Sequence, residues 1–244
     1  MTEPNPKYPA PPITEAVIDI QFGSPIDLNI LREATSELGP DYPIRNDLHE
    51  FQGQFNFGEK PSTETVQRTV GYRLDSSDKK RVVQIQSRGF TFSRLEPYVS
   101  WEEMRDEALR VWGIIRPKFS NSTVSRAAVR YINRINLPLP IKDLSEYLRV
   151  APDVPKDIEL PISGLLINLQ FAVSNLQANI ILNEAIVPPT KPDTIGLILD
   201  LDVSRAKSLP QDDKSLWRII EELHTCEYDF FQKCISEKTK GLFK

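Results

Sequence analysis

Apolar and polar residues alternate along the chain just after its proline-rich start. Residues 13–22 place Ala16, Ile18, Ile20 and Phe22 on one side and polar residues on the other. A two-residue period of this kind predicts a strand with one buried face. Short runs of the same type, separated by turn residues, predict that an antiparallel meander follows. They lie around residues 51–57, 66–74, 82–85 and 90–92, and later at 124–135, 165–173, 176–182 and 195–203.

Other stretches have the three-to-four-residue period of an amphipathic helix. We expect the first of them to begin with Ser24 as its N-cap and Pro25 in its first turn, and to end at Gly39. In the second, Ser100 and Glu103 fit a capping box. The four expected helices cover residues 24–38, 100–116, 140–149 and 213–235.

The order of these elements predicts the fold class. Residues 1–120 have the order strand, helix, meander, long helix, and residues 121–244 repeat it. We therefore predict an α+β protein in which two pseudo-repeated lobes form one compact unit. They would share a curved antiparallel sheet of about eight to ten strands, with two long helices packed on one face. This layout is similar to TATA-binding-protein-like and helix-grip folds, a likeness of topology that carries no function.

Composition narrows the function classes. The chain has 244 residues with a net charge of −4, and neither half is strongly basic. Nucleic-acid binding usually needs a basic surface, so a nucleic-acid clamp is only an alternative prediction. No apolar run reaches the ~18 residues of a membrane span, and the polar start is not typical of a secretory signal. We therefore expect a cytoplasmic protein with no membrane contact.

Five segments taken together resemble a known family. In their order along the chain they are Pro11–Ile18, Phe92–Leu95, Tyr98–Glu103, Arg130–Ile135 and Leu199–Asp202. The combination resembles a sporadically distributed bacterial family whose activity is not established. The resemblance implies a bacterial, intracellular protein. Sporadic distribution further implies an accessory gene, of the defence or toxin–antitoxin kind, with a protein partner encoded nearby. The family supplies no catalytic residues to transfer.

A row of arginines marks the strand expected at residues 124–135. Its two-residue period puts Arg126, Arg130 and Arg134 on one face. Each guanidinium is a planar fork of donors that suits carboxylates and phosphates. The candidate ligand-binding residues are Arg94, Arg126, Arg130, Tyr131, Asn133 and Arg134.

Two interpretations of the arginine row remain open. Asp200 and Asp202 share one face of the strand expected at residues 195–203, so the arginines could form cross-strand ion pairs with them. Alternatively, the row could line a groove for an anion or an acidic partner. We expect Arg130, in the middle of its strand, to be structural and Arg134, near the strand end, to be exposed.

Candidate catalytic chemistry is sparse. His49 and His224 are alone in their segments, and Cys226 and Cys234 follow the apolar period of one helix, too far apart for a disulfide. Phosphate-binding loops and nucleophile motifs are absent. We predict no catalytic residues, no metal and no cofactor. The prediction is a binding or regulatory module for a protein partner or small anionic ligand, with an enzyme of unknown reaction as the alternative. The oligomeric state stays open.

Overall fold

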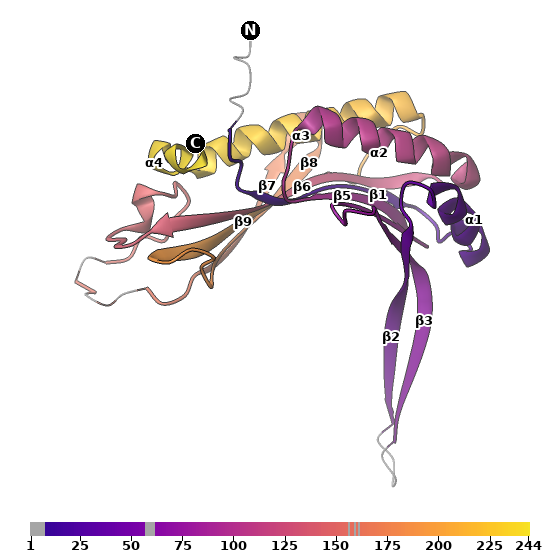
Figure 1. The fold of residues 1–244 in the computed structure, drawn as a ribbon, viewed down its shortest axis with the longest axis horizontal. Coiled ribbons are helices and arrows are strands. Elements are labelled where there is room, and N and C mark those ends of the chain that lie inside the picture. The colour runs from indigo at the N-terminus through magenta and orange to yellow at the C-terminus, as the bar shows by residue number, and fades with distance from the viewer. Residues whose placement is uncertain (1–7, 57–61, 156, 159, 161) are drawn as a thin grey trace. The chain divides into compact units, whose positions relative to one another are not determined.

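The computed structural model describes residues 8–56, 62–155, 157, 158, 160 and 162–244. Over these residues, nine strands form one antiparallel sheet in the order β2-β3-β4-β5-β1-β6-β9-β8-β7 (Figure 1). The strands are β1 (Ile13–Phe22), β2 (Ile44–Asn56), β3 (Ser62–Asp75), β4 (Arg81–Gln86), β5 (Gly89–Leu95), β6 (Val124–Pro138), β7 (Leu166–Val173), β8 (Ala178–Val187) and β9 (Thr194–Arg205). The helices are α1 (Leu28–Leu38), α2 (Trp101–Ile115), α3 (Asp213–Cys234) and α4 (Glu237–Lys240). The α+β class, the antiparallel sheet and the two long helices are confirmed.

Internal contacts divide the chain into two compact units. Unit 1 comprises Met1–Val17, Glu96–Tyr98 and Ala127–Lys244, and unit 2 comprises Ile18–Leu95 and Val99–Arg126. The boundaries fall inside β1 and β6, so each of these strands contributes residues to both units. The two units are described separately below.

Unit 2 has an aromatic core between its strands and α2. Ile18 and Ile20 are fully buried, as the alternation along β1 predicts. The Trp112 ring of α2 lies 6.2 Å from the ring of Phe22 and 5.4 Å from that of Phe90, between centroids. The paired strands β2 and β3 form a long hairpin that extends away from this core (Figure 1). The core therefore sits under α2 and includes Tyr72 and Leu74 of β3, whereas Phe51 and Val66 further along the hairpin are exposed.

The two helix starts in unit 2 test the capping predictions. Ser100 accepts a hydrogen bond from the backbone N–H of Glu103 at 3.1 Å, so the predicted cap of α2 is confirmed. The predicted start of the first helix at Ser24 is wrong, because Asp27 is the N-cap of α1. Its carboxylate accepts from the backbone N–H of Asn29 at 2.8 Å. Aspartate is as good an N-cap as serine. The helix therefore begins after Asp27 instead of after Ser24.

Unit 1 consists of a sheet covered on one face by α3 (Figure 1). Leu199 and Leu201 of β9 and Ile220 of α3 are fully buried between the two layers. The C-terminus folds back near the start of the unit, where the ring of Phe243 lies 5.1 Å from that of Tyr8. Alternate residues of each strand point away from α3 and make up the other face of this sheet.

The helix predicted at residues 140–149 is wrong. Only Leu144–Glu146 is helical there, as a single 3₁₀ turn capped by Asp143. After it, Leu148 forms a β-bridge to Ile235, and the N–H of Arg149 donates to Cys234 O at 2.7 Å. These hydrogen bonds to the segment at the end of α3 use backbone groups that a longer helix would have needed. The tertiary contacts therefore override the local preference for a helix.

Candidate functional site

Arg126 belongs to unit 2 and forms an ion pair within the sheet. Its Nη1 donates to Asp19 Oδ2 on β1 at 2.8 Å, and both side chains are partly exposed. Asp19 also accepts from Thr91 Oγ1 on β5 at 2.9 Å. The carboxylate therefore joins side chains from three strands, which is a scaffold role of the kind that the ion-pair interpretation describes.

Arg130 in unit 1 makes the bidentate pair that its fork geometry favours. Its Nε donates to Asp200 Oδ1 and its Nη2 donates to Asp200 Oδ2, both at 2.7 Å. These hydrogen bonds to Asp200 raise the pKa of the Arg130 guanidinium. The side chain of Arg130 is nevertheless 43% exposed, whereas that of Asp200 is only 10% exposed. One side of the pair therefore faces solvent.

The Arg130–Asp200 pair continues as a line of amides across the sheet. Asn183 Nδ2 of β8 donates to Asp200 Oδ2 at 3.3 Å, and Asn168 Nδ2 of β7 donates to Asn183 Oδ1 at 2.6 Å. Asn183 stands opposite both Asp200 and Asn168 in the strand register. These four side chains, one from each of β6, β9, β8 and β7, are called the polar row below.

The polar row lies on the face of the unit 1 sheet opposite α3. Leu199 and Leu201, the neighbours of Asp200 along β9, are fully buried under the helix. Because successive side chains of a strand point to opposite faces, Asp200 points away from α3. Exposure increases along the row, from buried Asp200 to exposed Asn168. The row therefore opens toward solvent at the β7 end.

Arg134, expected to be the exposed arginine, has a backbone partner. Its Nη2 donates to Pro188 O, in the proline-rich segment between β8 and β9. Its backbone N–H donates to Pro12 O at 2.8 Å. Its Nε is buried and has no hydrogen-bond partner among the described residues. The side chain is half-buried, so it is less open than predicted.

Tyr131 and Asn133 lie on the α3 side of the sheet, away from the arginines. Tyr131 is 3% exposed, and its hydroxyl lies 3.1 Å from Tyr98 Oη and 3.0 Å from His224 Nδ1. Burial raises its pKa well above the ordinary value. Asn133 Nδ2 donates to Leu199 O at 3.1 Å. The structure therefore does not bring these two residues together with Arg130 and Arg134.

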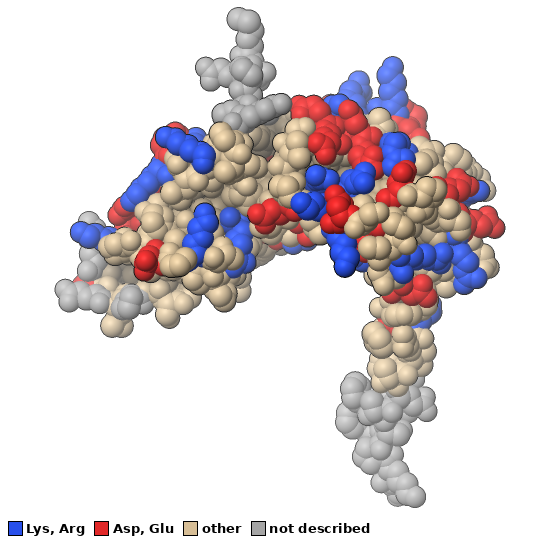
Figure 2. Space-filling view, in the orientation of Figure 1, with Lys and Arg blue, Asp and Glu red and all other residues tan. Residues whose placement is uncertain are grey.

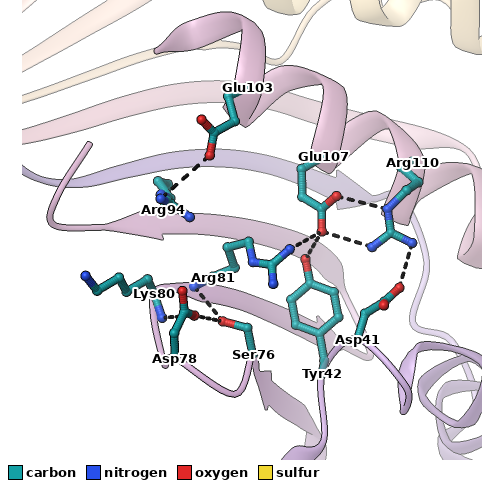
Figure 3. Close-up of polar contacts among 10 residues, drawn as sticks. All are labelled: Asp41, Tyr42, Ser76, Asp78, Lys80, Arg81, Arg94, Glu103, Glu107 and Arg110. Atoms are coloured by element: carbon teal, nitrogen blue, oxygen red, sulfur yellow. Dashed lines mark hydrogen bonds and ion pairs between the residues drawn. The ribbon is translucent and has the colours of Figure 1, made fainter. Parts of the chain in front are cut away.

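Arg94 of unit 2 lies beside α2 (Figure 3). Its Nη2 is 3.6 Å from Glu103 Oε1, and the side chain is 14% exposed. Its Nε is buried and lacks a hydrogen-bond partner among the residues described. Arg94 therefore belongs to the contacts between β5 and α2.

Glu107, one turn further along α2, joins several basic and phenolic groups (Figure 3). It accepts from Tyr42 Oη at 2.7 Å, from Arg81 Nη1 at 3.2 Å and from Arg110 Nε at 2.9 Å. Hydrogen bonds from Arg110 are the main cause of a lowered pKa for the Glu107 carboxyl. Arg110 also pairs with Asp41 at 2.9 Å. The network ties α2 to β4 and to the segment after α1, so it is best explained by stability.

Two buried glutamates in unit 1 were missed by the sequence analysis. Glu184 on β8 is fully buried and neither of its carboxyl oxygens has a hydrogen-bond partner among the described residues. Glu227 on α3 is 4% exposed. Burial raises the pKa of Glu184 to about 7 and that of Glu227 well above its ordinary value. Burial, together with these two acids, also raises the pKa of Cys234 to about 12.

The pattern of the sequence contained a signal for both glutamates. Glu184 comes two residues after Leu182, on the buried face of its strand, and Glu227 comes four residues after Leu223, on the buried stripe of its helix. The two-residue period of the strand and the helical period of α3 therefore place both glutamates at core positions. Both cysteines are free thiols. Within the described part of the chain, no group of three or more His, Cys, Asp or Glu side chains could hold a metal ion.

The surface charge agrees with the composition. On the face drawn in Figure 2, acidic and basic side chains are interspersed rather than gathered by sign. No helix among the described residues is long and apolar enough to cross a membrane. A scan against protein-family models finds no matching family, and a search of curated proteins finds no match either.

Proposed function

We propose that the chain is a binding module that recognises a protein partner through the polar row on the open face of unit 1. The observation that carries the proposal is the hydrogen-bonded line from Arg130 through Asp200 and Asn183 to Asn168. Its side chains are held by one another on four strands. A site on a rigid sheet is better positioned for recognition than one on loops.

The chemistry of the row favours a protein surface over a small anion. Asp200 already occupies the guanidinium fork of Arg130, so an anion would have to compete with a bidentate carboxylate. A protein partner needs no such exchange, because it can use the amide groups of Asn168 and the exposed part of Arg130. Arginine is also among the residues enriched in protein interfaces. The small anionic ligand therefore stays as the alternative.

The resemblance to a sporadically distributed bacterial family extends this proposal. It suggests a partner encoded by a gene next to that of this protein, in an accessory or defence-associated setting. The order of the elements supports a second proposal, that the two halves of the chain are pseudo-equivalent as in TATA-binding-protein-like folds. In the second half a 3₁₀ turn at Leu144–Glu146 would then take the place of α1.

The test is binding of the purified chain to the purified products of the adjacent genes, measured by calorimetry. Arg130→Lys keeps the charge but loses the bidentate fork, and we expect it to weaken binding at least about tenfold. Asn168→Ala should weaken it as well. Asn179→Ala, at an exposed position further along β8, is the matched control and should bind like the wild type. Equal affinity for all variants, or no binding to any product, would contradict the proposal.

A further inference from the structure

The outer strand of unit 1, β7, is the most exposed strand of that unit. It stands at the end of the strand order and pairs with β8, so its other edge has no strand beside it among the described residues. Leu166 is 81% exposed, and Leu169 and Phe171 are each more than one-third exposed although they are on the α3 face. The ring of Phe171 contacts that of Phe230 on α3, at 5.1 Å between centroids. The helix therefore leaves much of β7 uncovered.

Apolar side chains are also exposed just before β7. The exposed large apolar residues of this segment are Val154, Ile158, Leu160 and Ile162. Leu166 is exposed on the face of β7 that carries Asn168, whereas Leu169 and Phe171 are partly exposed on its α3 face.

The strand β7 itself has no charged residue. No Asp, Glu, Lys, Arg or His occurs between residues 160 and 183, although 26% of the chain is charged. The strand at the other end of the sheet order, β2, includes Arg45, Asp47 and Glu50. Proteins protect a free sheet edge with charges, prolines or bulges, since an unprotected edge adds a strand from another chain. β2 has this protection and β7 lacks it.

We propose that β7 pairs antiparallel with β7 of a second copy of this chain, so that the protein is a two-fold symmetric dimer. In a two-fold antiparallel pair, residue i of one strand faces residue j of the other and j faces i, so charges of one strand are brought against charges of the identical strand. A strand without charges is the kind that tolerates this arrangement without repulsion. Pairing supplies hydrogen bonds to the free backbone groups of β7, and Leu166 and its apolar neighbours become buried.

This inference and the proposal for the polar row share one residue, Asn168, which lies on β7 between Leu166 and Gln170. The dimer inference rests on the edge of β7 and its lack of charge rather than on Arg130 and Asp200. Arg130→Lys lies on β6, outside β7, so it should weaken partner binding and leave the dimer intact, which distinguishes failure of one proposal from failure of the other.

The test is the molar mass of the full chain over a range of concentrations, from sedimentation equilibrium. We expect the wild type to be a dimer. Leu166→Lys/Gln170→Lys places two exposed lysines on the same face of β7, where each meets those of the second copy. We expect this variant to dissociate at least about ten times more readily. The variant Leu166→Glu/Gln170→Glu should behave in the same way, and an equimolar mixture of the two variants should again form a dimer.

Phe51→Lys/Val66→Lys is the control, because it adds two lysines at exposed apolar positions of the β2–β3 hairpin instead. It should stay a dimer. Circular dichroism checks that every variant is folded, and the restored dimer in the mixture guards against a variant that merely unfolds. A monomeric wild type at all concentrations, charge variants that remain dimers, or a mixture that stays monomeric would overturn the proposal.

Discussion

Glu184 illustrates at the scale of one residue what burial does to a carboxyl group. Its side chain is fully buried without a hydrogen-bond partner among the described residues, and burial raises its pKa from 4.5 to about 7. Burial is the cause of this shift, and Glu184 and Glu227 both act on the nearby Cys234, so none of these three groups supplies a positive charge. An uncompensated buried carboxylate is costly, so the folded state holds the proton.

The shifted pKa of Glu184 predicts how stability depends on pH. Between about pH 4.5 and about pH 7 the folded chain binds more protons at this site than the unfolded chain does. The contribution of Glu184 to the free energy of unfolding therefore falls as pH rises through this range, and then levels off. With 1.36 kcal/mol for each unit, the full penalty is roughly 3 kcal/mol. Glu184→Gln keeps the shape and removes the ionisation, so it should be more stable than the wild type above pH 7.

Urea unfolding at about pH 5 and about pH 8 measures this difference. The stability gain of Glu184→Gln over the wild type should be larger at the higher pH. Glu222→Gln, at an exposed position of α3, is the control and should change stability little at either pH. If Glu184→Gln gained the same amount at both values, the side chain would not be titrating in the range that its burial predicts.

The sequence predicted well on which face of the sheet each candidate residue lies. It could not predict which carboxylate each arginine pairs with. Alternation along β6 correctly separates Arg130 and Arg134 from Tyr131 and Asn133. Which carboxylate each arginine meets depends on strand neighbours far away in the sequence. Arg126 pairs with Asp19 on β1, and this pairing has no local signal.

At the scale of elements, the Arg130–Asp200 pair joins two strands that are distant in the sequence. β6 and β9 pair antiparallel, with Ile132 opposite Asp200, so Arg130 reaches its partner diagonally. Removing the arginine leaves the largely buried Asp200 without its bidentate donor. Because Arg130 itself is partly exposed and water replaces some of the lost interaction, we expect Arg130→Ala to cost about 1–2 kcal/mol rather than the larger value of a fully buried pair.

A double-mutant cycle with Asp200→Asn measures the coupling between the two side chains. The loss in the double variant should be smaller than the sum of the single losses. Arg134→Ala is the comparison, and it should cost less because Arg134 donates to a backbone carbonyl and leaves no carboxylate unpaired. Equal losses for Arg130→Ala and Arg134→Ala would show that the carboxylate is not the source of the effect.

The second helix was predicted closely, whereas the helix expected at residues 140–149 was not. The second helix has the apolar stripe and the Ser100 cap, and α2 begins where they predict. The stretch at residues 140–149 has a start signal but no long stripe. Its backbone instead pairs with the segment around Ile235 after α3. A competing contact of this kind decides the structure only after the chain has folded, so the local sequence does not reveal it.

For the whole molecule, the sequence predicted the class and the number of strands but not their order. Neighbours such as β4 and β5 follow from a short turn between them. The position of β1 between β5 and β6 does not, since β1 and β6 are separated by a hundred residues of other elements. The hydrophobic period and the turn residues carry information about neighbours that are close in the sequence. Strand order depends on which strand edges pair during folding, and those strands can be far apart in the sequence.

The whole-molecule charge leads to a final prediction, that the chain does not bind nucleic acid. The net charge is −4, Arg126 and Arg130 are paired with carboxylates, and Figure 2 shows both signs interspersed on the face drawn. A protein gains affinity from counterion release only where its lysine and arginine side chains can contact nucleic-acid phosphates. We therefore expect no binding to oligonucleotides even at about 50 mM salt. Gel-shift titration with single- and double-stranded oligonucleotides measures this. A shift at micromolar protein that weakens with salt, and weakens again in Arg130→Ala, would restore the nucleic-acid clamp as the better explanation of the arginines.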